Sequence, residues 1–369
     1  MARIGLTLPR SEDLPRKEIV EVVQQAEALG YDSVWVGESW GRDGFTWLTQ
    51  LACHTNRIKL ATGITTVYSR SPALSAQTVA SLDEISEGRV VLGLGTSGPM
   101  VIENWHGMPF DRPMRRTREY IDIIRLILSG ERVNYPGEIF QLKGFRLPFT
   151  PVRASVPIYV ASLGPRNLRL TGELADGWLP IYLDATHLAD FQDHIAVGAR
   201  EGGRSLDAID VAPYILACVS EDVEAARRLV QAHLAYYIGG MGTFYANLIA
   251  RYGFEDEVSR VREAWGKRDR QSAASQVTDA MLGRMAICGS PQEGRAQLAQ
   301  YRAAGVTLPI VSFAHGALAR DDSTDPGGSR SLGWHGSEAL CLATGTGTDT
   351  DLIRRGNRTR HAAETPSGC

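Results

Sequence analysis

Short apolar runs alternate with amphipathic segments along most of the chain. Runs suited to buried strands lie at 3–9, 33–37, 58–62, 89–95, 158–162, 178–182, 211–219 and 308–313. Helix-like segments follow every run but the last, with apolar residues recurring every three or four positions, as in the segment 16–29. This alternation, without a Gly-x-Gly-x-x-Gly motif opening the first helix, predicts a closed (β/α)8 TIM barrel rather than a doubly wound sheet.

Three segments depart from the simple alternation. Around Pro136-Gly137, two short extended pieces predict a surface hairpin. Residues of about 222–285 read as several helices, broken at Gly239-Gly240 and Gly253, and are longer than a crossover needs, which indicates a helical insertion. Residues 317–369 are rich in Gly, Ser, Thr, Asp and Arg without an apolar period, so we expect a disordered low-complexity tail after a barrel spanning 1–316.

Composition narrows the classes of protein. The 369 residues are 43% hydrophobic with a net charge of −3, enough for a sizeable core, and they contain no Lys/Arg block of the kind that binds nucleic acid. No run approaches the roughly 18 apolar residues of a membrane span. Five scattered cysteines without a C-x-x-C pair, and histidines without metal-ligand spacing, favour a cytoplasmic protein that holds no metal.

In a barrel, ligands gather at the carboxyl ends of the strands, so residues just after each strand are the candidates for a site. The fully apolar run 90–94 passes into Gly93, Gly95 and Gly98 and then into Glu103, Asn104, Trp105 and His106. Its glycines first suggest a phosphate cradle. Within the polar cluster, His106 beside Glu103 is a candidate for a chemical role.

The ends of the second and third strands supply further candidates. Glu38 is either an acceptor for a ligand or the cap of a loop, and Trp40 either packs or stacks on a ligand. Gly63 interrupts a strand pattern, which suggests a bulge, a close backbone approach to a ligand or an ordinary strand end.

Two later turns could hold a phosphate. Ser162-Leu163-Gly164-Pro165 leads into a helix amino terminus, whose N–H groups and dipole favour anions, although a plain strand-to-helix turn also fits. Before the sixth strand, Gly177 could admit a phosphate and Trp178 could close the site.

Several stretches resemble the bacterial luciferase-like monooxygenase superfamily: ALGYDSVWV (28–36), RIKLATGI (57–64), LDEISEGRVVLGLG (82–95) and ELADGW (173–178). SGPMVIENWHGMPF (97–110) and YIGGMG (237–242) are similar to its branch of oxidoreductases dependent on coenzyme F420. The likeness runs in order through about residues 3–315 and says nothing of the tail.

The resemblance implies a deazaflavin across the carboxyl-end face of the barrel and a non-prolyl cis peptide, here Gly63-Ile64, behind its ring. Contacts with the ring and side chain would fall on Glu38, Trp40, Thr65, Thr66, Ser97 and Gly98, and the phosphate would lie near Ser162, Leu163, Gly164, Pro165, Gly177 and Trp178. On the basis of the resemblance, the phosphate is therefore not expected at the glycines after the fourth strand. Residues 103–106 are instead expected to form a wall of the substrate pocket.

The expected activity is hydride transfer between the deazaflavin and a small organic substrate, with Glu38, Glu103 and His106 as candidates for proton transfer. An FMN-dependent monooxygenase of the same superfamily and a barrel that binds a flavin without turnover are the alternatives. Relatives also suggest a homodimer.

Overall fold

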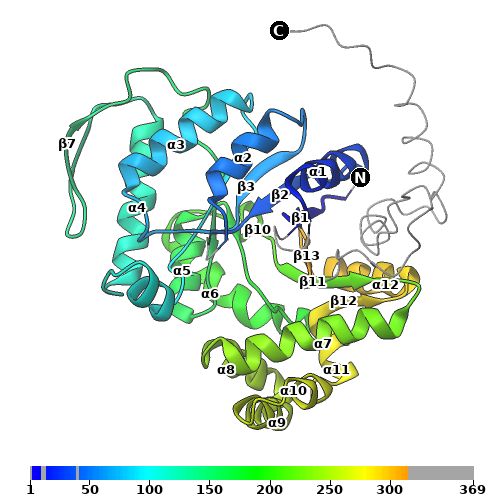
Figure 1. Ribbon diagram of the computed structural model, residues 1–369. Helices are drawn as coiled ribbons and strands as arrows, with labels where there is room; N and C mark the ends of the chain where they lie inside the picture. The colour runs from blue at the N-terminus through cyan, green and yellow to red at the C-terminus, as the bar shows by residue number, and fades with distance from the viewer. Residues whose placement is uncertain (1, 10–13, 39–40, 315–369) are drawn as a thin grey trace, which may run out of the picture.

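The computed structural model describes residues 2–9, 14–38 and 41–314, and it contains the predicted barrel (Figure 1). Parallel pairing runs from strand to neighbouring strand around the molecule. The strands of the ring are β1 (Gly5–Thr7), β2 (Ser33–Val36), β3 (Lys59–Thr62), β5 (Val90–Gly95), β8 (Ile158–Ala161), β9 (Gly177–Trp178), β10 (Asp210–Val211), β11 (Tyr214–Val219) and β13 (Ile310–Phe313).

The ring closes through the seventh strand, which is broken in two. β10 pairs with β9, and after Ala212-Pro213 the chain resumes as β11, which pairs with β13 and bridges to Ile181 through Tyr214. The predicted continuous strand 211–219 is corrected at this point, because Pro213 has no N–H to give to a ladder. β13 then pairs with β1, so the sheet has no open edge here.

Helices surround the strands, and their ends follow local sequence signals. Ser71 caps α3 with Pro72 at its first turn, and Ser290 and Glu293 form a capping box at the start of α12. The outer helices are α1 (Arg16–Ala28), α2 (Gly44–Ala52), α3 (Pro72–Ile85), α4 (Pro113–Leu128), α5 (Pro165–Leu174), α6 (Leu188–Glu201) and α12 (Pro291–Ala303).

Two further regions lie outside this ring. The predicted hairpin is present as β6 (Val133–Pro136) and β7 (Gln141–Phe145). The segment predicted as helical forms a group beside β11 and β12 in Figure 1, comprising α7 (Val223–Gly240), α8 (Phe244–Ile249), α9 (Glu255–Gly266), α10 (Arg270–Ser275) and α11 (Asp279–Met285). The proposed tail, 317–369, lies outside the described residues.

The pattern did not predict β12 (Ala286–Gly289), a short buried strand directly after α11. It pairs with the edge of β11 that lies opposite β13, beyond the point where β9 ends. None of the helices in the described part of the chain is both long and apolar enough to cross a bilayer.

The interior of the barrel contains aromatic side chains from different strands. Trp35 of β2 meets Tyr159 of β8 edge to face, with ring centroids 5.3 Å apart, and its indole N–H donates to the Ser33 hydroxyl at 2.9 Å. Both rings are almost fully buried. This packing fills the centre of the barrel and separates its two ends.

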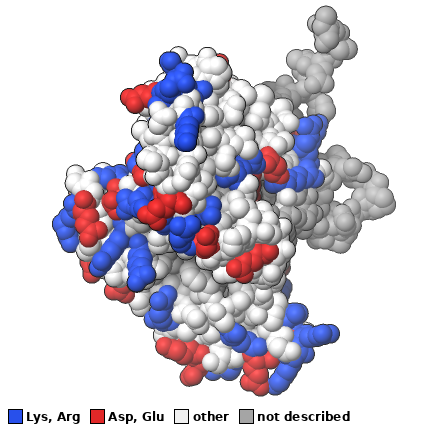
Figure 2. All heavy atoms as spheres, turned by 90° about the vertical axis from the view of Figure 1, so that its left-hand side faces the viewer, with Lys and Arg blue, Asp and Glu red and all other residues white. Residues whose placement is uncertain are grey.

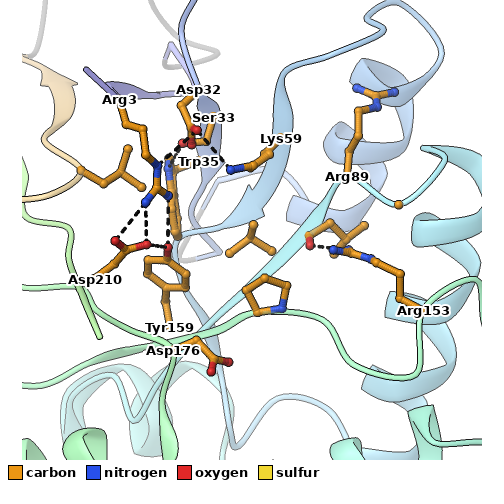
Figure 3. A pocket seen from close by; sticks show the side chains of 15 residues that line it. Arg3, Asp32, Ser33, Trp35, Lys59, Arg89, Arg153, Tyr159, Asp176 and Asp210 are labelled. Atoms are coloured by element: carbon orange, nitrogen blue, oxygen red, sulfur yellow. Dashed lines mark hydrogen bonds and ion pairs between the residues drawn. The ribbon is translucent and has the colours of Figure 1, made fainter. Parts of the chain in front are cut away.

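Charged side chains at the amino end of the barrel form ion pairs and hydrogen bonds with one another (Figure 3). The guanidinium of Arg3 donates to both carboxylate oxygens of Asp210, at 2.9 and 2.8 Å, and Tyr159 and Thr307 donate to the same carboxylate. Asp32 pairs with both Arg3 and Lys59. Burial alone would raise the pKa of Asp210, but the hydrogen bonds from Tyr159 and Arg3 and the charge of Arg3 outweigh burial and lower it.

Replacing Asp210 by Asn should therefore lower the free energy of unfolding by roughly 1–3 kcal/mol at pH 7, because Arg3 and Tyr159 lose a charged acceptor. The lowered pKa means that the stabilisation is present above the ordinary Asp pKa of about 4 and is lost as the pH falls below it. Denaturant unfolding of wild type and variant between pH 7 and 2 should give curves that converge in acid. Asp193→Asn, at an exposed position, is the control, and curves that stay parallel would contradict the assignment.

Candidate functional site

The carboxyl end of the third strand contains a β-bulge. Ala61 pairs with Val91, and the next pair, through β4 (Thr65–Thr66), joins Thr65 to Leu94. Between these two pairs the chain advances four residues from Ala61 to Thr65 but only three from Val91 to Leu94. One extra residue therefore lies between β3 and β4. The bulge suggested by Gly63 is present.

Thr62 and Gly93 hold the bulge together. The Thr62 hydroxyl accepts from the N–H of Gly93 and donates to its carbonyl, both at 2.8 Å, in place of ladder bonds. A Cβ at Gly93 would lie 2.0 Å from the Thr62 carbonyl oxygen. Gly93 is therefore needed for close strand approach, which explains this glycine without a phosphate.

The next peptide bond, Gly63–Ile64, is cis, as the resemblance implied. Tyr214 of β11 donates its hydroxyl to the Gly63 carbonyl at 3.0 Å, and a Cβ on Gly63 would lie 1.5 Å from that hydroxyl oxygen. The Ile64 carbonyl accepts from the N–H of Glu38 at 3.0 Å. Both carbonyls of the bulge thus accept hydrogen bonds, one from β11, which does not pair with β3, and one from the residues that follow β2, and its position is fixed.

Glu38, directly after β2, is anchored by three donors. Its carboxylate accepts from the Thr65 hydroxyl at 2.7 Å, the Arg70 guanidinium at 2.8 Å and, more weakly, the Gly44 N–H at 3.3 Å. The side chain is only 14% exposed. Of the two roles that the sequence left open, the structure shows the structural one, since Glu38 accepts from the first N–H of α2, next to the N-cap Asp43; its role toward a ligand stays a prediction.

Arg70 is a residue of this cluster that the sequence reasoning missed. It also pairs with Asp43, and although burial would lower its pKa, hydrogen bonding to Glu38 and the charges of Glu38 and Asp43 raise it. Tyr214 was missed as well. The only sequence signal for Arg70 is an isolated cation just before the Ser71-Pro72 helix start, which is too common to identify a site.

After β5 the chain changes direction in a conformation rare for its residue types. Ser97 has φ +56, in the left-handed region, and Gly98 has open space where a Cβ would be. A π-helical turn, Met100–Trp105, follows and carries Glu103 and Trp105, both exposed. His106 caps its carboxyl end and is also exposed.

A chain of contacts joins this turn to the third strand. The Phe110 N–H donates to Glu103 at 3.4 Å, Phe110 stacks on Tyr68 with centroids 5.4 Å apart, and Tyr68 closely follows Thr66 of β4. Residues 103–106, the rim residues, are thus connected through Phe110 and Tyr68 to the strand end beside Glu38. The structure gives no direct contact of His106 with Glu38 or Glu103.

The candidate phosphate turn is ordered by its neighbours. Ser162 is buried, with its hydroxyl bonded to Thr171 at 2.7 Å and its carbonyl accepting from the Trp178 indole at 2.7 Å. Gly164 caps α5 with φ −85, and no atom lies within 4 Å of where its Cβ would be. Leu163 is half-buried, and no side chain caps the first N–H groups of α5.

Gly177 and Trp178 of β9 are packed against neighbouring aromatic rings. A Cβ at Gly177 would lie 2.2 Å from the ring of Tyr159, and the Trp178 indole is fully buried against Phe191. Packing thus accounts for both residue types. Pro165 is exposed at the first turn of α5, Thr66 is buried in β4, and Trp40 lies outside the described residues.

The barrel also has a cavity of about 490 Å³ at its amino end, lined by Arg3, Asp32, Lys59 and their neighbours (Figure 3). Its charged groups are largely paired with one another, as described above. Within the described residues, no group of three His, Cys, Asp or Glu side chains could hold a metal ion. Gly98, Gly164 and the uncapped N–H groups of α5 lie at the carboxyl end, which makes that face the candidate site.

A family model for luciferase-like monooxygenases matches residues 2–308. The chain belongs to this family. It is an oxidoreductase, and the predicted resemblance is confirmed.

The most informative relatives fit the same assignment. The chain is 34% identical over 337 residues to a Mycobacterium tuberculosis protein named as a coenzyme F420-dependent oxidoreductase, covering 86% of this chain and 97% of that one. It is 35% identical to a 5,10-methylenetetrahydromethanopterin reductase of Archaeoglobus fulgidus, covering 81% and 90%. The structure of the coenzyme F420-dependent tetrahydromethanopterin reductase of Methanopyrus kandleri superposes with a TM-score of 0.77 at 26% identity, covering 92% and 96%.

The Glu38–Arg70 pair should be coupled in stability. In a double-mutant cycle of Glu38→Gln and Arg70→Met followed by denaturant unfolding, we expect a coupling energy of roughly 1–3 kcal/mol, because removing either partner leaves the other charge poorly solvated. The cycle of Arg70→Met with Asp43→Asn is the matched control. It should give a smaller value, since Asp43 is 45% exposed. Equal couplings would contradict the described anchoring.

Proposed function

We propose that the protein is a coenzyme F420-dependent oxidoreductase that transfers a hydride between the deazaflavin and a small organic substrate. The observation that carries the proposal is the similarity, over nearly the whole barrel, to relatives named for this cofactor. The residues of the carboxyl-end face fit such a ligand: the backbone is open at Gly98 and Gly164, and α5 offers N–H groups without a side-chain cap.

Each part of this face would hold a different part of the cofactor. The bulge at Gly63–Ile64, fixed by Tyr214 and Glu38, would support the ring, and the turn from Ser162 to Pro165 would bind the phosphate through the amino terminus of α5. When bound, the deazaflavin supplies the hydride chemistry. The protein contributes orientation and a proton.

Glu38 would orient the ligand, and the rim residues would supply the proton. The Glu38 carboxylate accepts from three donors, so it is held in one position and orients whatever lies on the bulge. Glu103 and His106 are exposed on and beside the π-helical turn, where a side chain can exchange protons with solvent and with a substrate. We assign proton transfer to these two residues.

The identity of the cofactor is tested by anaerobic titration of the protein with F420, reduced F420 and FMN, followed by fluorescence and absorbance. F420 should bind about tenfold or more tightly than FMN, a difference of about 1.4 kcal/mol in binding free energy. Oxygen uptake with reduced FMN should stay at the level without protein. Tighter binding of FMN together with oxygen consumption would instead identify a flavin monooxygenase.

Gly164→Ala should weaken F420 binding about tenfold, since a methyl group would stand over the N–H groups that face the phosphate. The backbone of Gly164 suits any residue, and the space above it is open, so the free energy of unfolding should change by less than about 0.5 kcal/mol. Gly283→Ala, at an equally open glycine in α11, is the control for affinity. Unchanged affinity in Gly164→Ala would place the phosphate elsewhere.

A further inference from the structure

Two buried cysteines lie side by side where the helical insertion joins the barrel. Cys218 of β11 and Cys288 of β12 are register partners in neighbouring parallel strands, so their side chains leave the sheet on the same face. Neighbouring strands lie about 4.8 Å apart, which is within the range of about 4.4–6.8 Å that the Cα atoms of a disulfide require. Both side chains are thiols here, and each residue is 3% exposed.

The two strands mark the two ends of the insertion. β11 ends at Val219, shortly before α7, and α11 leads directly into β12 at Ala286. The insertion stands beside the barrel in Figure 1, and in the lower part of Figure 2 it carries interspersed basic and acidic side chains, as a surface in water does. A bond between Cys218 and Cys288 would therefore close the whole segment 219–287 into a loop at its base.

The strand that carries Cys288 lies at an edge. β12 comes last in the strand order of the barrel sheet, and among the described strands it pairs with β11 alone. The ring closes through β11, β13 and β1, so β12 can separate from β11 without opening the ring. Local opening of this kind exposes buried groups while the rest of a protein stays folded. A small oxidant can reach the two thiols in this way.

Charged side chains of three helices act on Cys288: Arg227 of α7, Asp279 of α11 and Glu293 of α12. Burial raises the pKa of the Cys288 thiol to about 11, and the two carboxylates act in the same direction while Arg227 opposes them. The thiolate is the reactive form of cysteine. The closed fold therefore keeps this thiol protonated at neutral pH, and its oxidation should be slow and depend on opening of the edge.

We propose that Cys218 and Cys288 form a reversible disulfide under peroxide stress, which cross-links the base of the insertion. One thiolate attacks an oxygen of hydrogen peroxide and becomes a sulfenic acid, and the other oxygen leaves as hydroxide. The second thiolate then attacks the sulfenic sulfur and displaces its hydroxide. With the two thiol protons, two thiols and one peroxide give one disulfide and two water molecules.

The same geometry makes the bond easy to reduce. The side chains of register partners start about one strand spacing apart, which exceeds the mean Cβ–Cβ separation of about 3.8 Å in disulfides. Forming the bond must draw the two strands together, and strained disulfides are the ones that dithiols reduce readily. The cross-link should therefore be reversible.

The test uses the full chain with Cys53→Ser, Cys341→Ser and Cys369→Ser, which leaves this pair as its only cysteines. After treatment of the folded protein with hydrogen peroxide, thiols titrated in denaturant should fall from two per chain to near zero, and dithiothreitol should restore both. Mass spectrometry of unreduced peptides should show the Cys218 and Cys288 peptides linked. The oxidised form should melt roughly 5 °C above the reduced form, because the cross-link restricts the unfolded chain.

Cys218→Ala and Cys288→Ala in the same background are the matched controls, since peroxide also oxidises methionine. Their melting temperatures should not rise after peroxide treatment. Thiols that survive the treatment, conversion of both to sulfinic acids, or linkage that appears only after denaturation would each overturn the proposal. A linked form that melts no higher than the reduced form would overturn its role at the base of the insertion.

Discussion

The extra residue between β3 and β4 is the constraint on which the carboxyl end of the barrel depends. A sheet that gains one residue on one strand must satisfy the displaced backbone groups elsewhere, because a buried N–H or carbonyl without a partner is costly. Here the Thr62 hydroxyl hydrogen-bonds to both the N–H and the carbonyl of Gly93. The Tyr214 hydroxyl and the Glu38 N–H donate to the carbonyls of Gly63 and Ile64. The partners come from three other strands or strand ends, so the bulge ties the ring together at this level.

The two ends of the barrel use polar groups in opposite ways. At the amino end Arg3, Asp32, Lys59 and Asp210 neutralise one another and leave little for a ligand. At the carboxyl end, Glu38 accepts from three donors within the protein, while no side chain caps the amino terminus of α5 and most side chains of the π-helical turn are exposed. The charge network at the amino end and the proposed site at the carboxyl end are thus separated along the barrel axis, with Trp35 and Tyr159 packed between them.

The sequence was sufficient for features that depend on local pattern. Alternating periods predicted the barrel, and Gly63 suggested a bulge as one of three alternatives. Features that depend on distant contacts were out of reach: Arg70 meets Glu38 across 32 positions, and Tyr214 meets Gly63 across 151. β12 was missed because a four-residue buried run directly after a helix has no period of its own. For Gly177, the ring of Tyr159 accounts for the glycine through packing that no local pattern reveals.

The contrast between Glu38 and the rim residues also bears on how such a site can accept different substrates. A carboxylate held by three donors keeps one geometry whatever binds above it, so it suits an invariant ligand such as a cofactor ring. The exposed side chains of the π-helical turn, Met100–Trp105, take no part in the hydrogen bonds that hold the bulge, so they can vary without disturbing it. Changes at 103–106 would therefore alter the proposed substrate wall, while the contacts among Glu38, Thr65 and Arg70 keep the proposed cofactor platform unchanged.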